Sequence, residues 1–230
     1  MGICMRVTTL ALIAIGAPHS VLAQAAQPPG ESPILYGVYQ VITSDATTAD
    51  GHRNAGGPAM IPLLPAAVEQ MGAVDLARDP VKLCQPIGPF RMMAREQNKI
   101  EIMPLDGTLV MIFEDLSHGL MRAIHTDRGH LMDAEPTWLG DSVGRWEADT
   151  LVVDTTGFND RTWLNAIGAQ HSDQLHLIER IRPVASGAYL EYTVTAEDAG
   201  ALASPYTYTR FYERVDGEMS EDVCAYEWPD

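Results

Sequence analysis

The sequence contains few positive charges. Only two of its 230 residues are lysines, Lys82 and Lys99, and lysine and arginine together number 15 against 31 aspartate and glutamate residues. The formal net charge is −16 at pH 7. Because nucleic-acid binding needs a basic face that neutralises phosphates, this composition excludes nucleic acid as a partner. Anionic membrane surfaces are disfavoured for the same reason.

Long hydrophobic runs are also scarce. The apolar run at residues 7–17 is well short of the roughly 20 residues that span a bilayer. It follows Arg6 and precedes Val21, Leu22 and Ala23, which satisfy the small-residue rule for signal cleavage. We therefore expect a secretory signal peptide at residues 1–23, a flexible linker at 24–33 and a single domain at 34–230. The mature protein is expected to be periplasmic or secreted.

Cysteine is rare, with three residues in the chain. Cys4 leaves with the signal peptide, so the mature protein keeps an even pair, Cys84 and Cys224. In an oxidising compartment, such a pair predicts one disulfide. The alternative, a nucleophilic thiol at Cys84, lacks a histidine nearby in the sequence.

The usual signatures of phosphate, dinucleotide and metal sites are lacking too. The letters G-x-S-x-G at residues 140–144 run into a strand, whereas a nucleophile elbow runs into a helix, so Ser142 is a poor hydrolase nucleophile. His171 and His176 are five residues apart, which fits neither H-x-x-x-H on a helix nor H-x-H on a strand. We expect no cofactor and no metal, and a metal-dependent hydrolase ranks third among the functions considered.

Short strand-like segments are abundant. Nine segments are rich in β-branched and aromatic residues and mostly alternate: 34–40, 99–105, 107–115, 119–127, 145–158, 174–184, 188–198, 206–215 and 221–228. One helix is predicted at residues 65–78. With little room for crossover helices, the sheet is expected to be antiparallel. The sequence predicts a mainly β fold, a meander closed into a lipocalin-like β-barrel with one or two short helices and a ligand cavity; a β-sandwich is the alternative.

One predicted strand carries a carboxylate among aliphatic side chains. Alternation over residues 174–182 puts Glu179 on the same face as Leu175, Leu177 and Ile181. Burial there would raise the pKa of the carboxyl unless an arginine across the sheet pairs with it. Both alternatives are open from the sequence.

Residues 135–180 form a dense motif region. It is similar to a family of exported, mostly uncharacterised bacterial proteins that share E-P-T-W-x-G-x-S-x-G-R-W-E-x-D-T-L-V-V-D-T-x-G-F-N-D-x-T-W-L, followed by H-S-x-x-L-H-x-x-E-R. Upstream, DPVKLCQPIGPFR resembles the D-P-x-x-x-C-x-P-x-G-x-x-R of the same family, and YGVYQ is similar to its G-x-W segment, with Tyr39 in place of tryptophan. The resemblance implies a fold and an exported location, and it implies no reaction.

The chemistry is therefore predicted from residue types. Histidines and carboxylates supply acids and bases near neutral pH, and the candidate catalytic residues are His171, His176, Glu179, Asp160 and His130. The candidate substrate-binding residues are Asn159, Arg145, Trp138, Trp163 and Arg180. Asn159 and Asp160 have a structural alternative as a turn or helix N-cap. We expect residues 159–172 to fold over one barrel mouth and bring these groups to a shared rim.

Two functions fit this pattern. The first is a cofactor-independent lyase or isomerase acting on a small, partly apolar substrate, aromatic or hydroxylated, in the barrel cavity. The second is a lipocalin-like small-molecule binding protein without catalysis. The density of titratable side chains from Asn159 to Glu179 favours the enzyme, since a passive apolar carrier needs few of them. Whether the chain forms a homo-oligomer is left open.

Overall fold

The computed structural model describes residues 35–43, 45–95, 99–114, 121–220 and 224. The predicted signal peptide and linker lie outside the described residues, as does the strand expected at 221–228 except for Cys224. All the described residues belong to one compact unit.

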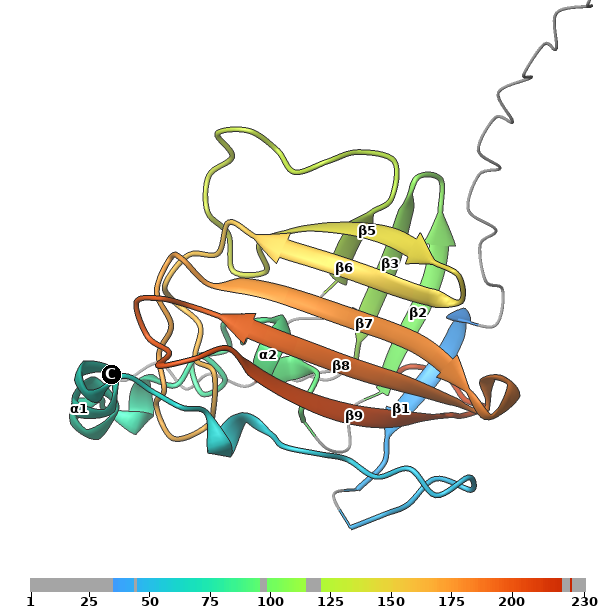
Figure 1. Ribbon diagram of the computed structural model, residues 1–230, viewed down its shortest axis with the longest axis horizontal. Helices are drawn as coiled ribbons and strands as arrows, with labels where there is room; N and C mark the ends of the chain where they lie inside the picture. Colours follow the sequence, from blue (N-terminus) through green and yellow to red (C-terminus); the bar gives the residue numbers. More distant parts are fainter. Residues whose placement is uncertain (1–34, 44, 96–98, 115–120, 221–223, 225–230) are drawn as a thin grey trace, which may run out of the picture. The chain divides into compact units, whose positions relative to one another are not determined.

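Nine strands close into a barrel (Figure 1), which confirms the predicted fold class. In chain order they are β1 (Gly37–Val41), β2 (Lys99–Leu105), β3 (Thr108–Phe113), β4 (Met121–His125), β5 (Asp141–Glu147), β6 (Thr150–Thr156), β7 (His176–Val184), β8 (Tyr189–Glu197) and β9 (Tyr206–Arg214). Each strand pairs with its neighbours in the sequence, and β1 pairs with β9 to close the ring. The segment predicted as one strand at 145–158 contains the end of β5, the turn at Ala148 and Asp149, and all of β6.

One strand pair corrects the expectation of a fully antiparallel sheet. β4 and β5 are parallel, with Ile124 opposite Ser142 and His125 opposite Val143. A closed ring with an odd number of strands cannot alternate direction at every pair, so a nine-stranded barrel needs a parallel neighbour. The chain provides it through residues 126–140, the long connection above β5 in Figure 1. We call this connection the β4–β5 loop.

The inside of the barrel is a packed core. Inward positions of the strands carry large buried side chains, among them Tyr39, Met111, Tyr192 and Tyr208. The short helix α2 (Pro89–Met92) contributes to the same cluster, because Phe90, Met92 and Met93 are almost fully buried. The Tyr208 hydroxyl donates to the Phe90 carbonyl and the Tyr212 hydroxyl to the Met93 carbonyl, so α2 is hydrogen-bonded to β9. Side chains and a helix therefore occupy space that the sequence assigned to a ligand.

The remaining helices lie between β1 and β2 and after β7. α1 spans Pro65–Ala73 and begins with proline, whose fixed φ suits the first helical turn. The predicted helix at 65–78 is thus shorter than expected and is followed by a separate 3-10 turn, η3 (Leu76–Arg78). Two further 3-10 turns are η2 (Pro58–Met60) and η4 (Ala185–Gly187). Within the described ranges, no helix is long and apolar enough to cross a membrane.

Two links fasten the segment between α1 and β2. Cys84 and Cys224 form a disulfide with a Cα–Cα distance of 5.9 Å, as the sequence predicted. Arg91 of α2 donates to both carboxylate oxygens of Asp79, at 2.8 Å each. Because both side chains are nearly buried, this ion pair fixes α2 relative to residues 79–85.

Candidate ligand-binding site

A polar groove of about 600 Å³ lies between the segment after β6 and the segment after α1. Its apolar lining consists of Ala73, Val74, Pro80, Leu83, Trp138 and Trp163. Its polar surface combines two carboxylates, two guanidinium groups and two amides: Asp75, Arg78, Gln85, Asp160, Arg161 and Gln170. We call this cavity the groove. Three of the residues predicted from the motif, Trp138, Trp163 and Asp160, meet here.

Asn165 holds the segment after β6 in its fold. Its Oδ1 accepts hydrogen bonds from the backbone N–H groups of Ile167 and Ala169, at 3.1 and 2.9 Å, and its amide donates to the Pro58 carbonyl at 3.1 Å. Trp163 is 4% exposed and Leu164 is 1% exposed, so both anchor the segment in the core. Ile167, in contrast, is exposed.

The Trp138 ring is the point where the β4–β5 loop meets the groove. The guanidinium carbon of Arg161 lies 5.9 Å from the centre of this ring, a cation–π distance. Thr137, beside Trp138, forms a parallel bridge with Phe158, and the Asn159 N–H donates to the Thr137 carbonyl at 2.8 Å. The ring and Arg161 are therefore held on adjoining backbone segments.

The groove continues into a second polar cavity of about 410 Å³. Asp160 and Gln170 line both cavities, and Asp173 and His171 line the second. Within the part of the chain that the structure describes, Arg78 and Arg161 form no ion pair with a carboxylate. Their guanidinium groups are thus available to a ligand in the groove.

His171 is engaged on both ring nitrogens. The Ser172 carbonyl lies 2.8 Å from Nδ1 and accepts its hydrogen, which leaves Nε2 to accept from the Thr162 hydroxyl at 2.6 Å. The side chain is 5% exposed, and burial lowers its pKa against the opposing effects of the Ser172 carbonyl and two nearby aspartates. His171 is therefore neutral at pH 7, and its hydrogen bonds are those of a structural residue.

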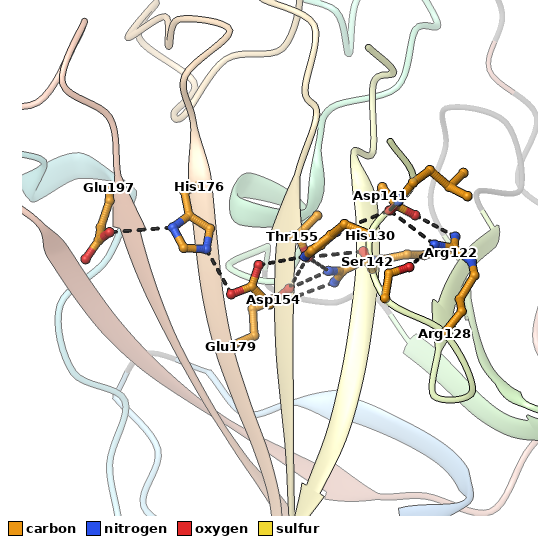
Figure 2. Close-up of polar contacts among 12 residues, drawn as sticks. Arg122, Arg128, His130, Asp141, Ser142, Asp154, Thr155, His176, Glu179 and Glu197 are labelled. Carbon is orange, nitrogen blue, oxygen red and sulfur yellow. Dashed lines mark hydrogen bonds and ion pairs between the residues drawn. The ribbon is translucent and has the colours of Figure 1, made fainter. Parts of the chain in front are cut away.

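Glu179 lies inside the barrel and pairs with Arg122 of β4 (Figure 2). Arg122 donates from Nη1 to Oε1 at 2.8 Å and from Nη2 to Oε2. The Tyr192 hydroxyl adds a hydrogen bond to Oε1 at 2.8 Å, while Ser142 and Thr155 accept from Arg122 at 3.0 and 2.8 Å. The alternative with an arginine partner is thus the observed one, and Glu179 lines neither the groove nor the cavity beside His171.

His176 and His130 lie on the outer wall of the barrel. In β7, His176 is separated from Glu179 by three positions, so alternation places them on opposite faces. Figure 2 shows both histidines on either side of Asp154: His130 Nε2 is 2.9 Å from Oδ1 and His176 Nε2 is 3.1 Å from Oδ2. The five predicted catalytic residues therefore do not share one rim: Asp160 and His171 line the cavity beside the groove, His130 and His176 lie on the outer wall, and Glu179 lies inside the barrel.

The other predicted substrate-binding residues make local contacts. Arg145 and Arg180 both pair with Glu147 at 3.0 Å on the exposed outer wall. Asn159 Oδ1 accepts from the Arg161 N–H at 3.2 Å, which is the turn geometry named as its structural alternative. Among the residues that the structure describes, no group of three histidine, cysteine, aspartate or glutamate side chains is placed to hold a metal ion.

Several residues of the groove and of the barrel interior were not predicted from the sequence. Asp75, Arg78 and Gln85 line the groove from a segment fifty or more residues before the motif. Arg122 was overlooked although it alternates with Ala123 and shares a face with the apolar Ile124. That alternation is a signal for an inward arginine, the partner that the carboxylate of Glu179 requires.

Comparisons with known proteins identify no family. No protein-family model and no curated protein matches the chain. Among solved structures, a zebrafish ileal bile acid-binding protein complexed with cholic acid matches with a TM-score of 0.38 and 9% identity, over 79% of this chain and 99% of that one. A mutant of the fluorescent protein UnaG matches with a TM-score of 0.38 and 11% identity, over 80% and 98%.

A secretory abundant heat-soluble protein from Ramazzottius varieornatus matches with a TM-score of 0.33 and 8% identity, covering 79% of this chain and 96% of that one. Likenesses of this degree concern the barrel alone.

Proposed function

We propose that the protein binds a small, neutral, hydroxyl-rich molecule, such as a saccharide, in the groove, without transforming it. The observation that carries this proposal is the lining of the groove, where Trp138 is accompanied by two guanidinium, two carboxylate and two amide groups. Hydroxyl groups both donate and accept, so they suit a mixture of Arg, Asp and Gln side chains. The flat aliphatic face of a sugar suits an indole ring.

The charges of the groove favour a neutral ligand. Two aspartates and two arginines line it, and the adjoining cavity adds Asp173. A chain with a net charge of −16 repels anions at long range. An apolar ligand would desolvate the polar side chains without giving them partners, which costs free energy.

The state of the predicted acid–base groups supports binding rather than catalysis. Both ring nitrogens of His171 are occupied, and Glu179 is bound by Arg122 and Tyr192 in the core. His130 and His176 are bonded to Asp154 on the outer wall. A general base must reach its substrate proton directly or through one water, and these groups are committed to protein partners. The disulfide supports an exported, periplasmic or secreted protein.

The test is a binding screen on the mature protein with neutral saccharides. Glucose, maltose and cellobiose would be compared with laurate as an apolar probe, using saturation-transfer NMR followed by titration calorimetry. We expect saccharide binding that weakens at least about tenfold in Trp138→Ala and Arg161→Ala, since each removes a central contact. Arg53→Ala removes an exposed arginine that does not line the groove and serves as the matched control. No saccharide binding, or saccharide binding that is unaffected by Trp138→Ala, would refute the proposal.

A further inference from the structure

A row of six charged side chains crosses the outer wall of the barrel (Figure 2). In spatial order, the charged row consists of Arg128, Asp141, His130, Asp154, His176 and Glu197. Asp141 and Asp154 stand on the neighbouring strands β5 and β6, and His176 and Glu197 stand opposite each other on β7 and β8. Arg128 and His130 come from the β4–β5 loop. The row therefore joins this loop to four strands.

The contacts alternate between bases and acids. Arg128 Nη2 lies 2.6 Å from Asp141 Oδ1, and Asp141 Oδ2 lies 3.1 Å from His130 Nδ1. His130 Nε2 lies 2.9 Å from Asp154, and Asp154 lies 3.1 Å from His176 Nε2. His176 Nδ1 ends the row at 3.5 Å from Glu197. Each histidine thus stands between two carboxylates.

The two hydrogen bonds of His130, to Asp141 and to Asp154, call for its protonated form. An ionised carboxylate only accepts hydrogen bonds, so a histidine bonded to two carboxylates needs an N–H on both ring nitrogens, and only imidazolium has both. With both histidines protonated, the row holds three positive and three negative charges. With both neutral, it carries an excess of two negative charges, and a nitrogen lone pair faces a carboxylate at each histidine. The other charged groups on the loop, Asp127, Asp133 and Glu135, are exposed carboxylates and add no cation.

The loop that the row holds also carries a wall of the groove. The Leu131 N–H donates to Asp141 Oδ2 at 2.9 Å, so loop residues 128, 130 and 131 all bind the Asp141 carboxylate. His130 also links the loop to β6 through its hydrogen bond with Asp154. Seven residues after Leu131, the same loop presents Trp138 to the groove.

We propose that protonated His130 is a positioning residue that latches the β4–β5 loop to strands β5 and β6, so that ligand binding in the groove is stronger at mildly acidic than at alkaline pH. The statement about binding rests on the proposed function, and the statement about the loop does not. His176 assists by bonding the second oxygen of Asp154.

The direction of the pH effect follows from the charges. A neutral imidazole, the form present at alkaline pH, has one N–H, so a histidine between two carboxylates then keeps only one of its two links. At the acid end, hydrogen bonds from Arg128, the Leu131 N–H and His130 outweigh burial and hold the pKa of the Asp141 carboxyl well below its usual range. Burial raises the pKa of Asp154, but the hydrogen bonds from His176 and His130 outweigh it and lower the pKa. Both aspartates of the row therefore stay ionised at a lower pH than unpaired aspartates, whose pKa is about 3.9.

The test for the loop needs no ligand. Amide hydrogen exchange of residues 126–140 would be measured at pH 5.5 and 8.5 and expressed as protection factors, which removes the intrinsic effect of pH on exchange. We expect protection in the wild-type loop to fall about fivefold between these values, as expected for losing a partly exposed charge-assisted hydrogen bond. His130→Gln should be weakly protected at both pH values. His52→Gln, which removes an exposed histidine paired with Asp50, is the control and should behave as wild type.

A second measurement separates this inference from the proposed function. The maltose affinity of the wild type and of His130→Gln would be determined at both pH values. We expect the wild type to bind maltose more tightly than the variant at pH 5.5 and about equally at pH 8.5. Loop protection that is independent of pH, or equal in wild type and His130→Gln, overturns the latch whether or not maltose binds. Loop protection that depends on pH, together with maltose binding that ignores Trp138→Ala, sustains the latch and rejects the groove as the binding site.

Discussion

Arg122 of β4 and Glu179 of β7 meet inside the barrel, with two guanidinium N–H donors bound to the two carboxylate oxygens. Their strands are not neighbours, because β5 and β6 lie between them in the sheet. Burial alone lowers the pKa of Arg122, but the charge of Glu179 and its hydrogen bonds raise it, so the guanidinium stays charged. The pair thus ties two separated strands by a fully buried ionic contact.

Removing one member of this pair should destabilise the barrel strongly. Glu179→Leu leaves the Arg122 charge buried without compensation, and we expect a loss of about 3–5 kcal/mol in the free energy of unfolding. The double variant Arg122→Met with Glu179→Leu restores an apolar interior and should be more stable than the single variant. Urea denaturation followed by circular dichroism measures both. A double variant no more stable than Glu179→Leu would contradict the argument.

The ion pair between Asp79 and Arg91 should matter for the same reason. Asp79→Asn leaves the Arg91 guanidinium nearly buried next to a neutral amide, and we expect a loss of about 3 kcal/mol in unfolding free energy. Glu191→Gln is the matched control, because its pair with Arg182 is partly exposed and should contribute less than about 1 kcal/mol. Urea denaturation measures the free energy of unfolding of both variants. Equal losses of this free energy would show that burial does not determine how much an ion pair contributes to stability.

The barrel could be predicted because its signals are local. Alternation and turn residues define each strand within about ten positions, and short connections between them leave few topologies. The parallel pair of β4 and β5 is not local, since it depends on how many strands the closed ring holds. The sequence also offered nine segments, although the one at 145–158 contains the end of β5 and all of β6. An odd count already implies a parallel pair in a closed ring, and the expectation of a fully antiparallel sheet did not use it.

The candidate site was harder to predict because it depends on register. Alternation alone assigns Glu179 inward and His176 outward, and an inward Arg122 could have been read from residues 121–125. The charged row, in contrast, requires the alignment of four strands and the course of a fifteen-residue loop, which no local pattern encodes. The groove combines Arg78 with Arg161, and only the tertiary fold brings these distant residues together.

The disulfide should contribute substantially to stability. Cys84 and Cys224 are 140 residues apart, so their link removes much of the entropy of the unfolded chain. On the loop-entropy model, we expect reduction, or the double variant Cys84→Ser with Cys224→Ser, to lower the unfolding free energy by about 2–5 kcal/mol. Thermal denaturation with and without reductant measures the difference. In the double variant, added reductant should not change the denaturation temperature. A change would mean that the reductant acts elsewhere than on this disulfide.

His171 should make the protein less stable as the pH falls. Because burial lowers its pKa in the folded state, the unfolded chain binds a proton near pH 6.5 that the folded chain does not. Stability from this residue is therefore fully present above about pH 7 and declines as the pH falls through 6.5. The free energy of unfolding, measured in urea at pH 7.5 and 5.5, should fall more in the wild type than in His171→Gln, which cannot titrate. The same variant pair cancels the contributions of His130 and His176, since both histidines are present in each. Equal declines in the two proteins would show that His171 takes up its proton as readily in the folded state as in the unfolded chain.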